Sequence, residues 1–253
     1  MNSLRSMSIV QLACLFVTPE QAVPVDLELQ LLVDVSGSVD DDEFELQRDG
    51  YVDAFEDAGI QSAIMNGAIG SIAVQYIYWS SFDQQAVSVD WTLIDSKATS
   101  DAFAAAIAAA PRSFSGFTGV QNALDFGVDE FADNGFEGTR LVMDVSGDGA
   151  DNECGFGGIC GTGGRDAALA VVDTINGVVI GGEAGVFDYY QNSVIGGDNA
   201  FVVTADNFDD FGAAVNEKIL KEISVVPVPT TLLLMGLGFA GLGYQRRKQI
   251  KAA

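Results

Sequence analysis

A hydrophobic segment ending in an Asp-x-Ser-x-Ser sequence constrains the fold of this chain more than any other. Residues 27–39 read LELQLLVDVSGSV, and the apolar run is typical of a strand buried on both faces of a sheet. The strand leads into Asp34, Ser36 and Ser38, with Gly37 allowing a tight turn. Alternate oxygen side chains at the carboxyl end of a central strand are suited to one hard cation. The segment therefore predicts a cation site at a sheet edge.

The segments that follow alternate between strand and helix patterns. Expected strands cover residues 71–80, 85–93, 140–145, 175–180 and 200–203. Expected helices cover residues 40–59, 101–110, 120–131, 165–172 and 207–223, with Gly59 closing the first. This order is typical of an α/β fold. We predict a single Rossmann-like domain over residues 25–223, with a central, mostly parallel β-sheet and helices on both faces.

Charge and composition exclude several classes of function. The sequence has no histidine, which excludes Ser-His-Asp triads, Cys-His pairs and His-ligated zinc. The net charge is -24, and five of the 12 basic residues lie in the terminal segments. We expect so acidic a body to repel nucleic acid and anionic lipid. The excess acid indicates a solvated surface, and more weakly the binding of divalent cations.

The first 22 residues have features of a secretory signal peptide. Arg5 precedes an apolar core at residues 7–17, and we expect cleavage after Ala22. Cys14 lies within this segment, so a lipoprotein site is the alternative.

The C-terminal segment, residues 226–251, combines a proline motif, a short apolar run and a basic end. The motif consists of Val226, Pro227, Val228 and Pro229. The apolar run, residues 230–244, spans about 22 Å as a helix, and its flank brings it near the roughly 30 Å of bilayer hydrocarbon. The combination resembles the PEP-CTERM sorting signal, including its VPLPA-CTERM class. The resemblance implies a transient transmembrane anchor with its basic end in the cytoplasm, removed by an exosortase-type protease. An ordinary tail anchor is the alternative.

Two later segments complete a pattern that resembles von Willebrand factor A domains. Residues 114–124, FSGFTGVQNAL, place Thr118 just before a helix, and residues 140–149, RLVMDVSGDG, end in Asp148 and Gly149. Together with Asp-x-Ser-x-Ser, these resemble the three motifs of the metal-ion-dependent adhesion site. The resemblance implies that Mg²⁺ or Ca²⁺, with Mn²⁺ as a third candidate, is bound by Asp34, Ser36, Ser38, Thr118 and Asp148.

Longer runs resemble one bacterial subfamily of these domains, DUF1194. They read DVSGSVDDDEFELQRDGY, YWSSFDQQAVSVDWTLI, FEGTRLVMDVSGDGADN, TINGVVIGG and YYQNSVIGGDNAFVV. The resemblance covers roughly residues 25–223.

Two cysteines, Cys154 and Cys160, flank the sequence GFGGI directly after the aspartate segment. An exported chain permits a disulfide, and a short glycine-rich loop allows its ends to meet. A zinc or redox pair is the alternative, although the neighbouring sequence offers no partner ligands. A disulfide here would stiffen the rim beside Asp148.

The expected ligand set indicates binding and not catalysis. Only Asp34 and Asp148 carry charge, so a bound cation keeps positive charge and water-filled positions that a partner carboxylate can occupy. We interpret the chain as an exported protein that binds an acidic group of a protein partner. It would pass through an inner-membrane-anchored intermediate to the cell surface, periplasm or extracellular matrix. The alternative is a structural envelope or matrix protein with a vestigial metal site.

An enzymatic function is not expected. A phosphotransferase built on Asp34 would need a second carboxylate two residues later, where Ser36 stands, and a nearby lysine. The body has only three lysines, Lys97, Lys218 and Lys221. The residue types therefore favour a binding protein.

Overall fold

The computed structural model describes residues 21–181 and 184–224. The sorting segment, residues 226–251, and nearly all of the expected signal peptide, residues 1–22, lie outside the described residues. Within the described ranges, no helix is both long enough and apolar enough to cross a bilayer.

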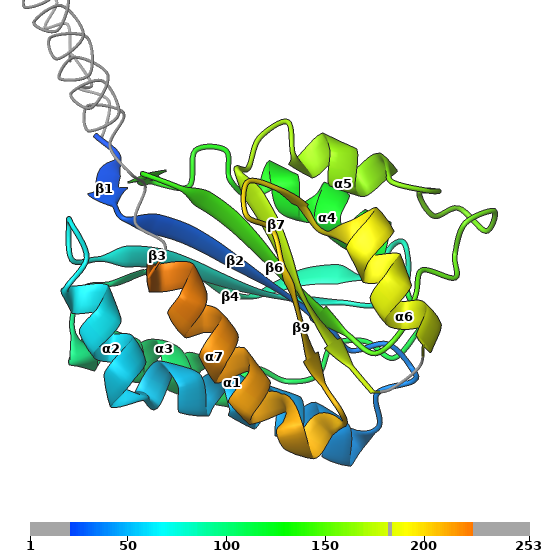
Figure 1. Cartoon of the computed structure of the whole chain (residues 1–253), viewed down its shortest axis with the longest axis horizontal. Helices are drawn as coiled ribbons and strands as arrows, with labels where there is room; N and C mark the ends of the chain where they lie inside the picture. Colours follow the sequence, from blue (N-terminus) through cyan, green and yellow to red (C-terminus); the bar gives the residue numbers. More distant parts are fainter. Residues whose placement is uncertain (1–20, 182–183, 225–253) are drawn as a thin grey trace, which may run out of the picture.

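The central sheet has seven strands in the order β4-β3-β2-β6-β7, with β8 and β9 both paired to β7 (Figure 1). The strands are β2 (Leu27–Asp34), β3 (Ile72–Trp79), β4 (Gln85–Ile94), β6 (Leu141–Gly147), β7 (Thr174–Ile180), β8 (Gly196–Gly197) and β9 (Val202–Ala205). Strands β4 and β8 are antiparallel to their neighbours, whereas the other pairs are parallel. The predicted, mostly parallel sheet is confirmed. Strands β1 (Val23–Val25) and β5 (Phe136–Gly138) form a separate parallel pair.

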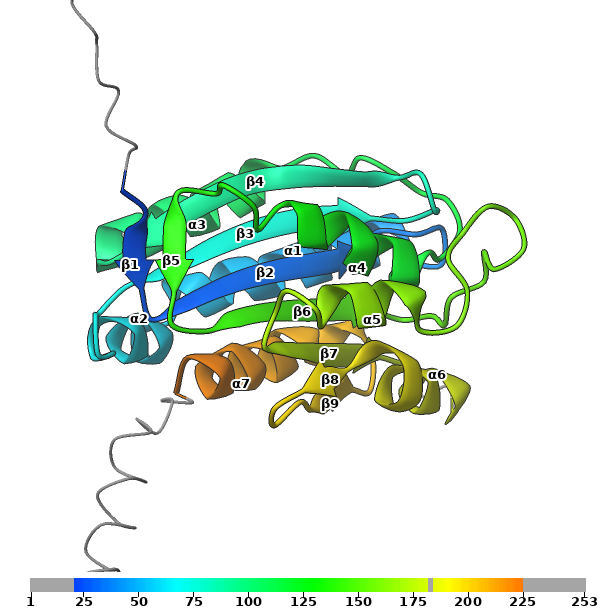
Figure 2. The same ribbon diagram turned by 90° about the horizontal axis from the view of Figure 1, so that it is seen from above.

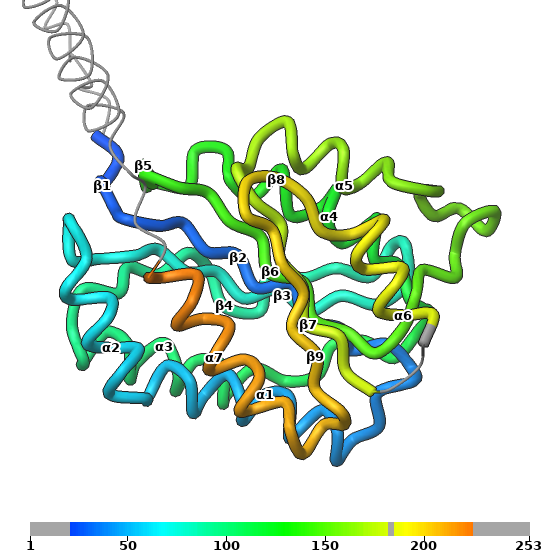
Figure 3. The backbone as a smooth tube through the Cα atoms, viewed as in Figure 1, coloured from blue at the N-terminus to red at the C-terminus, as the bar shows by residue number. Residues whose placement is uncertain are grey.

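Helices cover both faces of the sheet, as predicted (Figures 1 and 2). One face packs against α1 (Asp41–Glu56), α2 (Ala58–Met65), α3 (Lys97–Ala109) and α7 (Phe211–Ser224). The other packs against α4 (Val120–Asp129), α5 (Gly163–Ala168), α6 (Ala184–Tyr189) and the π-helical turn Tyr190–Val194. Both ends of the described chain lie at the opposite end of the sheet from the carboxyl ends of β2, β6 and β7 (Figure 3).

The first predicted helix is in fact two helices, and the prediction that Gly59 closes it is wrong. Helix α1 begins with a capping box, in which Asp40 and Glu43 each accept the backbone N–H of the other. It ends before Asp57, whose backbone is extended. The Asp57 carboxylate then accepts the backbone N–H groups of Gly59 and Ile60, which starts α2. Gly59 therefore lies in a first turn and not at an end.

A buried ionic cluster ties α7 to β6. Lys218 Nζ lies 2.5 Å from Asp144 Oδ1 and 2.7 Å from Glu222 Oε1, and all three side chains are buried. Asn176 of β7 donates a further hydrogen bond to Glu222 Oε1 at 2.7 Å. Burial raises the pKa of Asp144 to about 7, while the Lys218 charge opposes this rise. Two carboxylates thus share one ammonium group inside the apolar core.

Candidate metal centre

The candidate site lies where β2 and β6 end side by side. Their parallel register sets Val33 opposite Ser146, so Asp34 at the end of β2 and Asp148 just after β6 lie at the same edge of the sheet. The chain leaves β2 toward the helices of one face, and the segment before α4 crosses from α3 on that same face to α4 on the other. Such a crevice at the carboxyl ends of parallel strands is where open α/β sheets bind ligands.

Asp34 is a fully buried carboxylate whose second oxygen has no hydrogen bond within the described residues. The backbone N–H of Ser36 donates to Oδ1 at 2.7 Å, and Gln47 of α1 donates to the Asp34 carbonyl at 2.8 Å. Burial raises the pKa of Asp34 to about 7, and the nearby charge of Asp148 raises it further. A buried carboxylate beside a second carboxylate is costly unless a cation lies between them.

The hydroxyl side chains link the two carboxylates. The hydroxyl oxygens of Ser36 and Ser38 are 3.1 Å apart, and Ser38 Oγ donates to Asp148 Oδ1 at 2.8 Å. Thr118 lies against the aspartate turn, because a Cβ at Gly149 would be 3.4 Å from Thr118 Oγ1. The structure therefore brings the three predicted motifs together.

The site opens into one cavity. Ser38, Thr118 and Asp148 line a volume of about 610 Å³, and Asp34 and Ser36 are buried behind them. Carboxylate and hydroxyl oxygens are hard donors, which fit Mg²⁺ or Ca²⁺. No group of three or more His, Cys, Asp or Glu side chains suited to a metal occurs in the described ranges. Ion binding here would thus depend on the hydroxyl groups as well as on the two carboxylates.

Arg112 holds the Asp-x-Ser-x-Ser loop in shape, a role the sequence analysis missed. Its Nη2 donates to the carbonyl oxygens of Val35, Ser36 and Val39 at 3.2, 3.0 and 2.5 Å. Its Nε donates to the Phe114 carbonyl in the threonine segment at 3.1 Å. The sequence offers only a weak signal for this role. Few basic residues occur in the body, and Arg112 lies two residues before the threonine segment.

Gly147 and Tyr190 pack around the carboxylate of Asp34. A Cβ at Gly147 would lie 2.6 Å from the Tyr190 hydroxyl and 2.8 Å from Asp34 Oδ2, so only glycine fits. Burial, followed by the Asp34 charge, raises the pKa of Tyr190 well above its usual value. The hydroxyl is therefore a protonated, neutral group beside Asp34. No motif in the sequence predicts a role for Tyr190, because this residue lies on a π-helical turn far along the chain from Asp34.

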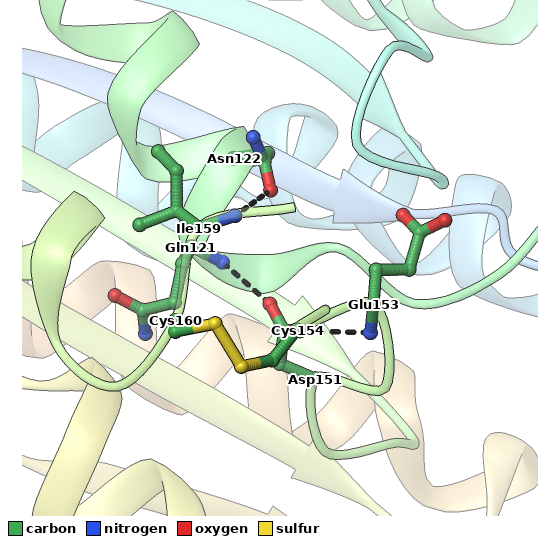
Figure 4. Close-up of a disulfide and its surroundings, with 7 residues drawn as sticks. All are labelled: Gln121, Asn122, Asp151, Glu153, Cys154, Ile159 and Cys160. Carbon is green, nitrogen blue, oxygen red and sulfur yellow. Dashed lines mark hydrogen bonds between the residues drawn. A yellow bond between two sulfur atoms is a disulfide. The ribbon is translucent and has the colours of Figure 1, made fainter. Parts of the chain in front are cut away.

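A disulfide joins Cys154 and Cys160, whose Cα atoms are 4.8 Å apart (Figure 4). The same loop is bound to the start of α4. Asp151 accepts the backbone N–H groups of Gln121 and Glu153, both at 3.1 Å, and Asn122 accepts that of Ile159 at 2.9 Å. The threonine segment is bound as well, because Asn152 Oδ1 accepts the N–H of Thr118 at 3.1 Å. The disulfide thus closes a loop that buttresses the candidate site.

We expect removal of this disulfide to destabilise the domain modestly. Replacing both cysteines by serine (Cys154→Ser/Cys160→Ser) should lower the free energy of unfolding by about 2 kcal/mol, as expected for so short a closed loop. Urea unfolding of the full chain measures the loss, and reductant should lower the stability of the wild type but not of the variant. Alkylation of both wild-type cysteines without reductant would contradict the bridge.

The fold and the site together define a von Willebrand factor A-like domain. Among solved structures, proximal thread matrix protein 1 from the mussel byssus matches with a TM-score of 0.59 and 13% identity, covering 79% of this chain and 48% of that one. The same protein "with zinc occupied MIDAS motif" matches with a TM-score of 0.57 and 15% identity, covering 78% and 45%. The pilus adhesin SpaC from Lactobacillus rhamnosus GG matches with a TM-score of 0.58 and 16% identity, covering 82% and 32%. This chain therefore spans less than half of each.

Within this class, the chain belongs to the family described as "Protein of unknown function (DUF1194)", whose model matches residues 24–227. Residues 225–248 match the PEP-CTERM protein-sorting motif, which indicates export through a membrane-associated intermediate. A search of curated proteins gave no match.

Proposed function

We propose that this chain is an exported surface or matrix protein that binds an acidic group of a protein partner through a divalent cation. The ligands of the cation are Asp34, Ser36, Ser38, Thr118 and Asp148. The observation that carries the proposal is Asp34, a fully buried carboxylate with an unpaired oxygen that lies beside a second carboxylate and a chain of hydroxyl groups.

The chemistry required of the protein is positioning. When bound, Mg²⁺ or Ca²⁺ supplies positive charge for a partner carboxylate. Asp34 and Asp148 supply the negative charge that retains it, and the hydroxyl groups supply neutral oxygen ligands. Arg112 and Gln47 hold the Asp-x-Ser-x-Ser loop in place through hydrogen bonds to its carbonyl oxygens. Because a bound cation would engage both carboxylates and the remaining ligands are neutral hydroxyl groups, we propose a binding role and no catalysis.

The orientation of the domain supports a surface role. The described chain ends at the opposite end of the sheet from the candidate site (Figure 3). An anchor that follows residue 224 would therefore join the domain at the end opposite the site. Two of the similar structures come from a thread matrix protein and a pilus adhesin, which supports a matrix or surface setting.

A capture experiment tests the proposed binding. The immobilised full chain should retain a partner from a native cell envelope extract in Mg²⁺ or Ca²⁺ and release it in EDTA. Asp34→Asn should abolish retention, whereas Ser36→Ala should weaken it less, because a hydroxyl contributes one neutral ligand and no charge. Ser113→Ala, an exposed serine of the same rim, serves as the control and should bind like wild type. Equal retention in EDTA would refute the proposal.

Processing of the C-terminal segment is a separate prediction. If an exosortase-type protease reads residues 226–229, replacing Pro227 and Pro229 by alanine should leave the uncut form in the inner membrane. Immunoblots of membrane and released fractions measure this, with Pro111→Ala, an exposed proline in the body, as the control. Normal release of the doubly substituted chain would show that the motif is not read.

A further inference from the structure

A second cavity beside the candidate metal centre is surrounded by exposed phenylalanines from three different loops. Phe82, Phe117 and Phe156 are 37%, 67% and 80% exposed and line a volume of about 360 Å³. Phe82 follows β3, Phe117 precedes Thr118, and Phe156 lies within the disulfide loop. Exposed phenylalanines gathered around one hollow are unusual on a folded surface and indicate a contact site.

The same cavity contains a buried carboxylate that lacks a counter-ion. Glu153 is only 2% exposed; its carboxylate accepts hydrogen bonds from the backbone N–H of Phe82 and the hydroxyl of Ser81, but its Oε2 has no partner within the described residues. Asp83 also lines the cavity, and no lysine or arginine in the described part of the chain forms an ion pair with either acid. Figure 4 shows the Glu153 carboxylate directed away from the disulfide. A buried carboxylate of this kind favours a cation from elsewhere.

The other two buried glutamates have different surroundings. Glu28 accepts hydrogen bonds from Asn134 and from the backbone N–H of Gly138. Glu222 lies 2.7 Å from Lys218 Nζ. Glu153 differs from both because it lies at the wall of an open cavity and not within the core.

Hydrogen bonds between the three loops preform the cavity. The backbone N–H groups of Gly116 and Phe117 donate to the hydroxyls of Ser80 and Ser81, both at 2.8 Å. The disulfide loop packs on the Phe82 ring, since a Cβ at Gly157 would lie 3.1 Å from its Cζ. A ligand therefore meets a surface that is already assembled, which lowers the entropic cost of binding.

We propose that this cavity binds the cationic side chain of a lysine or arginine on a protein partner. Phenylalanine faces attract organic cations through their quadrupole, and Glu153 and Asp83 supply full negative charge. The apolar stem of either side chain suits the aromatic walls. The net charge of -24 adds long-range attraction for a basic partner. The proposal does not depend on the metal centre, although Asn152 lines both cavities.

Nuclear magnetic resonance titration of the full chain in EDTA tests the proposal. The probes are the N-acetyl, N′-methylamide derivatives of lysine and arginine, with the norleucine derivative as the neutral comparison. We expect both cations to shift the amide signals of Gly155, Phe156 and Gly157, and norleucine to bind about tenfold more weakly. Because EDTA removes divalent cations, failure of the proposed metal site leaves this result unchanged.

Substitutions identify the groups responsible. Glu153→Gln keeps the shape of the side chain and removes its charge. It should weaken the binding of the lysine and arginine derivatives about tenfold, so that they bind no more tightly than the norleucine derivative. Phe156→Leu removes a highly exposed ring without disturbing the core and should also weaken them. Glu137 is an exposed acid elsewhere on the surface, and Glu137→Gln should leave the binding of all three probes unchanged. Equal binding of norleucine, unchanged binding by Glu153→Gln, or no shift with any probe would overturn the proposal.

Discussion

Replacing Asp34 by asparagine should remove the stabilisation of the domain by Mg²⁺ or Ca²⁺ without unfolding it. A cation at 100 times its dissociation constant stabilises the folded wild type by about 2.7 kcal/mol. The variant loses one of the two charged ligands, so the cation should add almost nothing to its free energy of unfolding. Asparagine is preferable to alanine because Asp34 is fully buried, and truncation would leave a cavity. Thermal unfolding of the full chain, with metal and with EDTA, measures the difference.

The same variant should change the pH dependence of stability in EDTA. The pKa of Asp34 rises from 3.8 to about 7 on folding, chiefly through burial and then through Asp148. Between these values the folded state retains a proton that the unfolded chain has lost. The free energy of unfolding therefore falls as pH rises through this window, by at most ~1.4 kcal/mol per pH unit. Asparagine should remove this part of the slope, while the contribution of Asp144, whose pKa burial also raises to about 7, remains.

An exposed acid gives the matched control. Asp129→Asn, at the end of α4, should keep the full stabilisation by metal. If the metal stabilised Asp34→Asn and the wild type equally, the ion would be bound elsewhere on the acidic surface. The proposed metal site would then be wrong, although the fold would be unaffected.

Replacing Lys218 by methionine should cause the largest loss of stability in the core. The substitution leaves Asp144 and Glu222 buried without their shared ammonium, and breaking a buried ion pair in this way costs about 3–5 kcal/mol. Protonation of Asp144 relieves part of this repulsion, so the loss should be smaller at pH 5 than at pH 8. Urea unfolding at both pH values measures it.

Lys221 provides the comparison on the same helix. It is exposed and lies 3.4 Å from the centre of the Phe201 ring, so Lys221→Met should cost about 1 kcal/mol or less. Similar losses for the two lysines would show that the buried cluster does not determine the stability of α7.

Several parts of the candidate site were predictable because their signals are local. Asp34, Ser36 and Ser38 lie within five residues of one another at the end of an apolar run, and the Asp-Gly turn at Asp148 follows another such run. Strand and helix periodicities depend on which side chains face the core, so the order of elements was also predictable. The division between α1 and α2 was missed because a single side chain, Asp57, determines it.

Other parts depend on contacts between distant segments. Arg112 binds carbonyl oxygens more than 70 residues away, and Lys218 meets Asp144 only when α7 packs on β6. The cavity around Glu153 brings together Phe82, Phe117 and Phe156, none of which is among the predicted metal ligands.

Local periodicity and spacing are enough to specify the α/β class, the order of the main strands and helices, and the residue types of the metal motifs. Packing between distant segments is what buries the Asp34 carboxylate with an unpaired oxygen and places a second acidic, aromatic cavity beside the site. The physical reason is that burial and electrostatic pairing depend on which side chains meet across the sheet. Strand register and packing determine these side-chain contacts, and a local sequence pattern does not specify either of them.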